Sequence, residues 1–415
     1  MNNFLTCILV ESIDLVKTAG PETNYTICGA PVFLYTLDEL KKLEANQIIL
    51  SCKTEKFMNL TLNEYEKIKV TDKNISDIIK NITENNKTGT LLIATADVPA
   101  ITAKTLKEAY EYHISKNNKI TDLTLNDRDH SDNDFLGIYF INIEKFLDFI
   151  SSAVSQDNED LIGKISSDKP DLYIVSDNRE NIKVKDSFTL NLAEQVILRR
   201  IIKRHMENGV IFHLPDTSFI HKDVKIGSGT VIYPGTILEG NTIIGNNCEI
   251  GPYSRIEDSV IADNVKFMNS VMIKSQIGDN TTVGPFAYIR PGSKIGRNIK
   301  IGDFVEIKNA VIDDYTKVSH LSYVGDADVG KSVNFGCGSV IVNYDGKKKH
   351  RTKVGNYAFI GCNANLVSPV IINDNAYVAA GSTITEEVPE YALAIARSRQ
   401  TIIENWVKRK GLNKK

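Results

Sequence analysis

The sequence predicts a two-part protein: an α/β domain followed by a left-handed parallel β-helix, joined by a long helix. An aliphatic residue returns at every sixth position through much of the second half of the chain. Short apolar segments alternate with helical segments in the first 185 residues, which is typical of an α/β domain. The stretch 190–207 contains neither glycine nor proline and lies between the two patterns. These three observations carry the prediction.

The six-residue repeat fits neither the period of an α-helix nor that of an ordinary hairpin strand. It fits a short strand and a turn, three times per coil, with the aliphatic side chain inside a triangular prism. Glycine or another small residue often follows the aliphatic one, which leaves room at the tight corner. The repeat therefore predicts a left-handed parallel β-helix. Its positions form three runs: Ile220, Ile226, Ile232, Leu238, Ile244, Ile250 and Ile256; then Ile277, Val283, Ile289, Ile295, Ile301 and Ile307; then Val354, Ile360, Leu366, Ile372, Val378 and Ile384.

The N-terminal part is expected to hold a mostly parallel sheet, because its apolar strand candidates alternate with helices. We place the α/β domain at 1–186, the connecting helix at 187–210 and the β-helix at 211–388. A C-terminal helix with a basic tail is expected at 389–415, with its helical part over 396–410. The strand candidates are Phe4–Val10, Gln47–Leu50, Thr90–Ala94 and Gly137–Ile141, and the clearest helices are Leu37–Glu44 and Ala103–Lys116.

Composition excludes several classes of function. The 415 residues carry a formal net charge of −3, so no general affinity for nucleic acid is expected. No apolar stretch is long enough for a transmembrane helix, and Phe4–Val10 lacks the flanks of a secretion signal. The six cysteines show no C-x-x-C spacing, which favours reduced thiols in a cytoplasm. We expect a cytoplasmic protein that binds small molecules rather than nucleic acid or membrane.

The chemistry is expected where the repeat is interrupted, between residues 308 and 353, because a prism needs only regularity to fold. There His320 is the side chain whose ordinary pKa suits base chemistry at neutral pH. Arg290, Lys308 and Lys349 would supply cations suited to a phosphate. Each residue alone has a structural or solvated interpretation, so the combination carries the hypothesis.

The segment 342–350 breaks the six-residue phase and contains three consecutive lysines. Because lysines are poorly suited to burial, we expect this segment to leave the coil as a loop.

Longer sequence motifs are more specific than the six-residue repeat, which many sugar acyltransferases share. They are Ile289-Arg290-Pro291-Gly292, Gly302-Asp303-Phe304-Val305-Glu306-Ile307-Lys308, His320-Leu321-Ser322-Tyr323-Val324-Gly325-Asp326, Asn343-Tyr344-Asp345-Gly346 and Ala392-Leu393-Ala394-Ile395-Ala396-Arg397. Over residues 188–407 they closely resemble the acetyltransferase half of the bifunctional GlmU family. Members of that family make N-acetylglucosamine 1-phosphate and then UDP-N-acetylglucosamine. The resemblance implies acetyl-CoA as co-substrate and a homotrimer with sites between neighbouring prisms.

The resemblance also implies residue roles. His320 falls at the position of the general base, which takes a proton from the glucosamine amine. Substrate-binding positions are Arg290, Lys308, Tyr323, Asn334 and Lys349. Acetyl-CoA positions are Cys337, Asn343, Tyr344, Cys362, Ala380 and Arg397, with Cys362 in place of the serine of many relatives.

The expected mechanism is direct transfer in a ternary complex. A neutral imidazole, positioned by Glu306 or by a backbone carbonyl, would remove the proton as the amine attacks the thioester. A backbone N–H of the prism would stabilise the oxyanion. The two cysteines are interpreted as small residues lining the site and not as nucleophiles.

The N-terminal half departs from the family, whose first strand runs into a glycine-rich loop with a catalytic arginine. Here the first strand continues as Glu11-Ser12-Ile13-Asp14-Leu15-Val16-Lys17, which places two carboxylates where polyphosphate would bind. Asp97, in Thr95-Ala96-Asp97-Val98-Pro99, resembles a magnesium ligand of the family, but Ser187 stands in place of the second. The resemblance therefore implies a degenerate nucleotidyltransferase-like (Rossmann-like) domain with uridylyl transfer lost and a Mg²⁺ site that is vestigial.

Three alternatives stay open at this point. The N-terminal domain could retain uridylyl transfer by an altered site. The acetyltransferase could act on another amino-sugar phosphate. The whole could be a non-catalytic trimeric scaffold that binds a sugar nucleotide, although such a scaffold has no need of His320 with its cationic neighbours.

Overall fold

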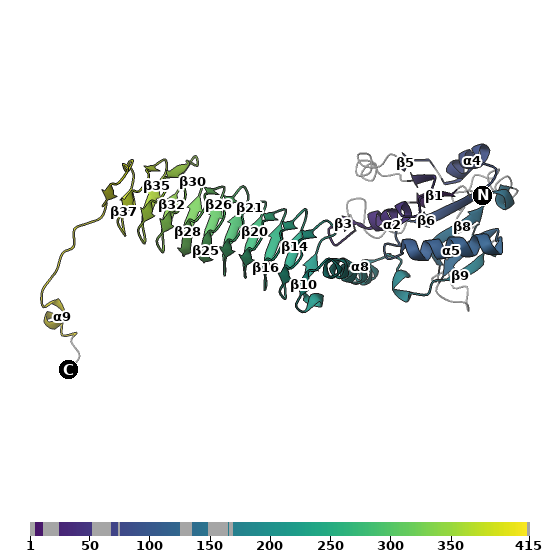
Figure 1. The fold of residues 1–415 in the computed structure, drawn as a ribbon, viewed down its shortest axis with the longest axis horizontal. Helices are drawn as coiled ribbons and strands as arrows, with labels where there is room; N and C mark the ends of the chain where they lie inside the picture. Colours follow the sequence, from purple (N-terminus) through teal and green to yellow (C-terminus); the bar gives the residue numbers. More distant parts are fainter. Residues whose placement is uncertain are drawn as a thin grey trace. The chain divides into compact units, whose positions relative to one another are not determined.

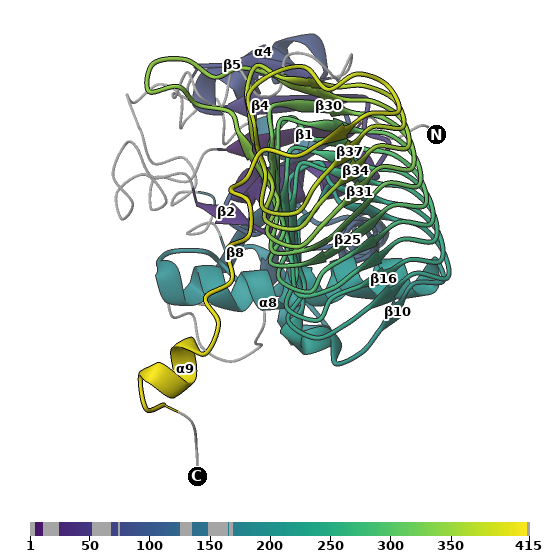
Figure 2. The same cartoon turned by 90° about the vertical axis from the view of Figure 1, so that its left-hand side faces the viewer.

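The structure is a computed structural model that describes residues 5–10, 25–51, 68–73, 75–124, 135–147, 165 and 169–412. The chain divides into two compact units, Met1–Arg200 and Ile201–Lys415. Figures 1 and 2 draw both units, and each is described by itself below.

The N-terminal unit is built on a mixed sheet whose described strands follow the order β5-β4-β1-β6-β8-β7-β9. Strand β8 is antiparallel to β6 and β7, and the other described pairings in this sheet are parallel. The mostly parallel α/β sheet predicted from the sequence is therefore confirmed. The strands are β1 (Leu5–Val10), β4 (Gln47–Ser51), β5 (Ile68–Thr71), β6 (Thr90–Thr95), β7 (Ile120–Thr124), β8 (Phe135–Asn142) and β9 (Asp171–Ile174), and a two-stranded ribbon pairs β2 (Thr26–Ile27) with β3 (Ala30–Pro31).

Helices cover both faces of this sheet and bury its apolar side chains. Helices α2 (Val32–Lys41) and α5 (Ala103–Lys116) contribute to one apolar cluster, and α4 (Ile75–Asn85) contributes to the other. Helix α5 has the predicted bounds. Helix α2 begins five residues earlier than expected, directly after Pro31, and buries Val32 and Phe33 in its first turn.

The predicted connecting helix is α8 (Ser187–Glu207). The Asp186 carboxylate accepts a hydrogen bond from the Thr189 backbone N–H at 2.8 Å and so caps its first turn. The helix ends at Asn208 and Gly209, and Gly209 has a φ of 85°, which favours glycine. Short 3-10 turns lie at Asn178–Glu180 and Pro215–Thr217.

The C-terminal unit is a parallel β-helix with three sheets, as the repeat predicts (Figure 2). Sheet 1 contains β10 (Ile211–Phe212), β13 (Val231–Ile232), β16 (Glu249–Ile250), β19 (Lys266–Phe267), β22 (Thr282–Val283), β25 (Lys300–Asp303), β28 (Lys317–His320), β31 (Asn334–Phe335), β34 (Phe359–Ile360), β37 (Tyr377–Val378) and β39 (Leu393–Ala394). Sheet 2 contains β11 (Phe219–Ile220), β14 (Ile237–Glu239), β17 (Arg255–Glu257), β20 (Val271–Ile273), β23 (Tyr288–Arg290), β26 (Glu306–Lys308), β29 (Tyr323–Gly325), β32 (Val340–Val342), β35 (Asn365–Val367) and β38 (Thr383–Ile384). Sheet 3 contains β12 (Lys225–Ile226), β15 (Ile243–Ile244), β18 (Val260–Ile261), β21 (Gln276–Ile277), β24 (Lys294–Ile295), β27 (Val311–Ile312), β30 (Ala327–Val329), β33 (Thr352–Val354) and β36 (Ile371–Ile372).

The repeat positions form the core of the prism, and all of them except the half-buried Ile226 are buried. The coils continue through both intervals where the repeat had seemed to be interrupted. Ile261, Phe267 and Met272 fill the first interval, and Ile312, Val324 and Val329 are among those that fill the second. The expected interruption over 308–353 is therefore wrong for most of its length, because some sides of the prism are five residues long instead of six.

One loop does leave the coil, as predicted, at residues 343–350. Val329 pairs with Val354, and Val354 with Ile372, so one coil has 25 residues and the next has 18. Tyr344 and Lys349 form an antiparallel bridge within the loop.

The C-terminal helix predicted over 396–410 is wrong in extent, because only α9 (Trp406–Arg409) is helical there. Ile402, Ile403, Trp406 and Val407 are exposed, and an isolated helix without a packed apolar face is marginal in water. Within the described residues, no helix is both long and apolar enough to cross a membrane.

Candidate functional site

His320 lies at the last position of β28, at the corner between sheets 1 and 2. Its Nδ1 is 2.5 Å from Oδ1 of Asp303, which occupies the same position one coil earlier. Both side chains are accessible, with exposed fractions of 56% for His320 and 38% for Asp303. The hydrogen bond to the imidazole holds the pKa of Asp303 below its ordinary value.

Glu306 does not position His320, which corrects the expectation from the sequence. Its Oε1 accepts a hydrogen bond from Nη1 of Arg290 at 2.7 Å. Both residues are on sheet 2, where Arg290 lies one coil before Lys308. Glu306 therefore orients Arg290. The carboxylate that contacts His320 is that of Asp303 and not that of Glu306.

Arg290, Lys308 and Lys349 form a cationic group on one side of the prism. Arg290 and Lys308 are register partners in β23 and β26. The neighbouring Lys308 ammonium lowers the pKa of Lys349, and the Arg290 charge acts in the same direction. Three like charges held this close favour the binding of an anion. The structure thus brings together the three cations predicted from the sequence.

Asp326 holds Lys308 of this cationic group in place. Its carboxylate accepts hydrogen bonds from Nδ2 of Asn309 at 2.7 Å and Nδ2 of Asn343 at 2.5 Å, and Nζ of Lys308 is 3.5 Å away. Burial alone would raise the pKa of Asp326, but these hydrogen bonds and the lysine charge hold it below its ordinary value. A permanent negative charge therefore anchors Lys308.

The side chain of Tyr323 packs against Gly325, which lies two residues later in β29. A Cβ atom on Gly325 would lie 2.3 Å from the Tyr323 hydroxyl, so only glycine fits beneath the ring. The same hydroxyl accepts a hydrogen bond from Nδ2 of Asn343 at 3.2 Å. Tyr323 is therefore held beside Asn343 and Asp326, at the base of the loop.

The loop 343–350 is closed by Asp345. Its carboxylate accepts hydrogen bonds from the backbone N–H groups of Lys347 and Lys348, both at 2.7 Å, and lies 2.6 Å from Nε2 of His350. The backbone N–H of Lys348, followed by His350, keeps the pKa of Asp345 well below its ordinary value. These bonds shape the turn that carries Lys349.

A column of small side chains continues the corner beyond His320. The backbone N–H of Gly338 bonds to the carbonyl of His320, that of Asn363 to Cys337, and that of Gly381 to Cys362. Cys337, Cys362 and Ala380 therefore occupy successive coils, and all three are accessible to solvent. Cδ of Arg397 lies 3.9 Å from the position of a Cβ on Gly381. We call this set the small-residue column.

Asn334 and Tyr344 lie on other elements than Arg290, Lys308 and Tyr323. Asn334 is on β31 in sheet 1, whereas Arg290, Lys308 and Tyr323 are on sheet 2. Tyr344 is exposed in the loop, where its hydroxyl donates a hydrogen bond to the carbonyl of Gly346 at 2.7 Å. The site within one chain therefore comprises the corner, the cationic group and the small-residue column.

Asp97 follows β6 in the N-terminal unit and is fully buried. Neither of its carboxylate oxygens has a hydrogen-bond partner in the described part of the chain, and Nζ of Lys183 lies 3.8 Å from Oδ2. Ser187 is exposed at the start of α8. Among the described residues no group of three or more His, Cys, Asp or Glu side chains could hold a metal ion. The charged partner of the buried Asp97 carboxylate is therefore the Lys183 ammonium.

The residues Glu11, Asp14 and Lys17, which the sequence places after the first strand, lie outside the described residues.

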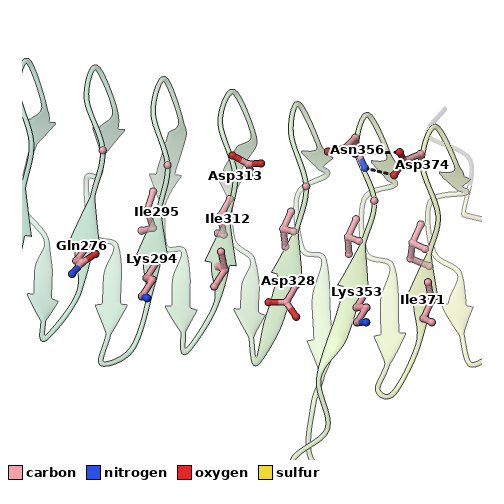
Figure 3. Close-up of a pocket in the computed structure, with 18 of the residues that line it drawn as sticks. Gln276, Lys294, Ile295, Ile312, Asp313, Asp328, Lys353, Asn356, Ile371 and Asp374 are labelled. Atoms are coloured by element: carbon pink, nitrogen blue, oxygen red, sulfur yellow. Dashed lines mark hydrogen bonds between the residues drawn. The ribbon is translucent and has the colours of Figure 1, made fainter.

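A separate groove of about 750 Å³ runs along sheet 3 (Figure 3). Lys294, Asp328 and Lys353 alternate along its strands with inward-pointing aliphatic residues. At one end, Nδ2 of Asn356 donates to Oδ2 of Asp374 at 3.1 Å. None of the site residues predicted from the sequence lines this groove.

Sequence reasoning missed Asp303 and Asn309, and it assigned no role to Asp326. A usable signal was present, because Asp303 precedes His320 by one coil and has the same position in its side of the prism. Residues one coil apart are neighbours in a β-helix, so the search for partners of His320 needed that spacing.

Comparison with known proteins defines the class. The family described as bacterial transferase hexapeptide (six repeats) matches residues 223–258, 274–309 and 351–386. The "Bifunctional protein GlmU" of Acetivibrio thermocellus is 48% identical over 367 residues, which cover 79% of each chain. That of Clostridium beijerinckii is 41% identical over 440 residues, which cover 96% of this chain and 97% of its own.

A solved 4-diphosphocytidyl-2C-methyl-D-erythritol synthase from Anaerococcus prevotii is similar at a TM-score of 0.35 and 12% identity, over 47% of this chain and 96% of its own.

With its parallel β-helix and hexapeptide repeats, the chain is an acyltransferase. It belongs to the family of bifunctional GlmU proteins.

Proposed function

We propose that the protein transfers the acetyl group of acetyl-CoA to the amine of glucosamine 1-phosphate, giving N-acetylglucosamine 1-phosphate for UDP-N-acetylglucosamine synthesis. One observation carries the proposal. His320 lies at the corner where the small-residue column begins. Sheet 2, which begins after this corner, carries Arg290 and Lys308 of the cationic group. A base between an anion site and an open column is the arrangement that acyl transfer to a sugar phosphate needs.

The cationic group would bind the phosphate of the acceptor. Arg290 is oriented by Glu306, and Lys308 is held by Asp326, so both charges are fixed before the substrate arrives. Lys349 enters from the loop and adds a third charge. Tyr323 would contact the sugar ring, which brings the 2-amine toward the corner.

The small-residue column would hold acetyl-CoA. Cys337, Cys362 and Ala380 leave space for an extended chain along the corner, and Arg397 offers a cation for its phosphates. Asn343 and Tyr344 lie at the base of the loop, where they would meet the acetyl end. The cysteines act here as small side chains.

In the reaction, the amine nitrogen attacks the thioester carbon while Nε2 of His320 accepts a proton from the amine. The new C–N bond forms, the C–S bond breaks, and the CoA sulfur leaves with a proton returned from the imidazolium. A backbone N–H of the corner would stabilise the oxyanion.

The test is the rate of CoA release with glucosamine 1-phosphate. His320→Ala should lower kcat by about 10²–10⁴-fold with modest changes in KM. His213→Ala, which alters a histidine stacked on Tyr233 near the start of the prism, is the matched control and should leave kcat unchanged. An unchanged kcat in His320→Ala would remove the histidine from this role.

The same assay tests the phosphate site. Arg290→Ala should raise KM for the sugar phosphate by about tenfold or more and leave KM for acetyl-CoA within about twofold, because a lost charge-assisted bond acts on its own ligand. Arg255→Ala is the control, since Arg255 forms similar ion pairs with Glu239 and Glu257 on the same sheet. Equal effects on both substrates would contradict the assignment.

We further propose that the protein works as a cytoplasmic homotrimer. Asn334 is consistent with this, because it lies on sheet 1, whereas Arg290, Lys308 and Tyr323 lie on sheet 2, and a site between two prisms would bring both sheets to one sugar. Sedimentation would show a species three times the mass of the chain.

For the N-terminal unit we propose that uridylyl transfer is lost. The approach of Lys183 to buried Asp97 supports this, because the ammonium supplies the positive charge that a magnesium ion would supply in an active site. The two carboxylates after the first strand add a repulsive charge for a triphosphate.

A further inference from the structure

We propose that Asp303 is a positioning residue for His320: it accepts the Nδ1–H of the imidazole, directs the Nε2 lone pair at the amine and stabilises the imidazolium formed during acetyl transfer. The inference deepens the proposed function and rests on it for the identity of the base.

The contact itself determines which nitrogen is free. Oδ1 of Asp303 lies 2.5 Å from Nδ1 of His320, which is within hydrogen-bond distance. An ionised carboxylate can only accept, so Nδ1 must carry the hydrogen. Nε2 is then left with its lone pair, which is what a general base needs.

The backbone makes the pair rigid. Asp303 and His320 are partners in parallel strands β25 and β28. The residues that follow them, Phe304 and Leu321, both turn the corner with positive φ, 53° and 47°. The Leu321 N–H bonds to the Asp303 carbonyl at 3.0 Å, and the Phe304 ring stacks on Phe286 at 5.4 Å. The carboxylate is thus delivered by a fixed corner of the prism and needs no loop movement.

Other charged groups around the corner are already engaged. Glu306, on the adjacent sheet, bonds to Arg290, and Asp326 bonds to Asn309, Asn343 and Lys308. The next coil presents the Cys337 side chain at this position. Within the described residues, Asp303 is therefore the carboxylate that meets His320.

Two substitutions separate its two contributions. Asp303→Ala removes both the hydrogen bond and the charge, and we expect kcat to fall by about 10–100-fold, with KM for both substrates within about twofold. Asp303→Asn keeps an acceptor oxygen for Nδ1–H but removes the charge. Its kcat should therefore lie between those of Asp303→Ala and the unaltered enzyme. Glu249→Gln, which removes an exposed carboxylate paired with Lys266 on the same sheet, is the matched control and should match the unaltered enzyme.

The comparison of kcat with KM distinguishes positioning from a loss of structure. Loss of a positioning carboxylate lowers kcat and leaves both KM values nearly unchanged, whereas a distorted corner changes the KM values as well. Circular dichroism and the melting temperature check that each variant is folded.

The outcomes separate the inference from its premise. If His320→Ala retains activity, the base assignment fails and the proposed function with it. If His320→Ala is inactive while Asp303→Ala keeps full kcat, the assignment of the base stands and the role of Asp303 is overturned. A lower kcat of Asp303→Ala at unchanged KM, with partial recovery in Asp303→Asn, supports the proposal.

Discussion

Asp122 lies in the middle of β7 and is fully buried. Neither of its carboxylate oxygens meets a hydrogen-bond partner in the part of the chain that the structure describes. Burial raises its pKa to about 8 from an ordinary value of 3.8. The folded chain therefore holds this side chain protonated at a pH where the unfolded chain would release the proton.

Asp122 makes the stability of the fold depend on pH. Between pH 4 and 8 the unfolded state binds fewer protons at this position than the folded state, so the contribution of Asp122 to stability falls as pH rises. Asp122→Asn removes this titration. We expect the variant to gain about 1 kcal/mol or more at pH 7, or about 2–4 °C in melting temperature, and nothing at pH 4. Melting curves of the N-terminal transition at both pH values would check this, and a gain independent of pH would contradict it.

Candidate site residues could be proposed from the sequence where a side chain is distinctive. His320 stands out because the chain has seven histidines among 415 residues, and Lys308 because it belongs to one of the longer sequence motifs that resemble the family. Asp303 did not stand out, since acidic residues are common at turns and its role depends on which residue lies one coil away. Which of the two carboxylates contacts His320 depends on how the side chains of neighbouring coils meet, and residue spacing alone does not give this.

The loop 343–350 is the element that departs most from the repeat. Asp345 closes it through bonds to two backbone N–H groups and His350. Asp345→Ala should loosen the turn and raise KM for the sugar phosphate by about tenfold, because the charge-assisted hydrogen bonds that hold Lys349 in place are lost. The melting temperature should change little, since the turn lies outside the prism.

Glu249→Gln serves again as a control for the loss of an exposed carboxylate. A fall in kcat of Asp345→Ala without any change in the sugar-phosphate KM would show that the loop acts on chemistry instead of binding.

Helices and strands were predicted well where buried apolar residues recur at a regular spacing. The prism strands and α5 follow from periodic apolar residues that have a core to enter. The segment 396–410 has apolar residues at helical spacing, yet Ile402, Ile403 and Val407 have nothing described to pack against. Propensity alone does not form a helix of this length, and so the prediction failed.

The chain belongs to a family of bifunctional proteins, and the proposed loss of uridylyl transfer predicts that only one of the two activities is present. We expect the purified protein to release no pyrophosphate from UTP and N-acetylglucosamine 1-phosphate, with or without Mg²⁺. Acetyl transfer should be unaffected by EDTA, because none of its proposed residues needs a metal. Pyrophosphate release comparable to acetyl transfer, and dependent on Mg²⁺, would overturn the loss of the first activity.

The small-residue column has one more consequence. His320, Cys337, Cys362, Ala380 and Arg397 lie on successive coils, so about four strand spacings of 4.8 Å, or about 19 Å, separate the base from the terminal cation. If acetyl-CoA binds along the column as proposed, the length of its path is set by a whole number of coils. Insertion or removal of one coil would change that length by one strand spacing and leave the corner at His320 in place, so the length can change only in whole steps.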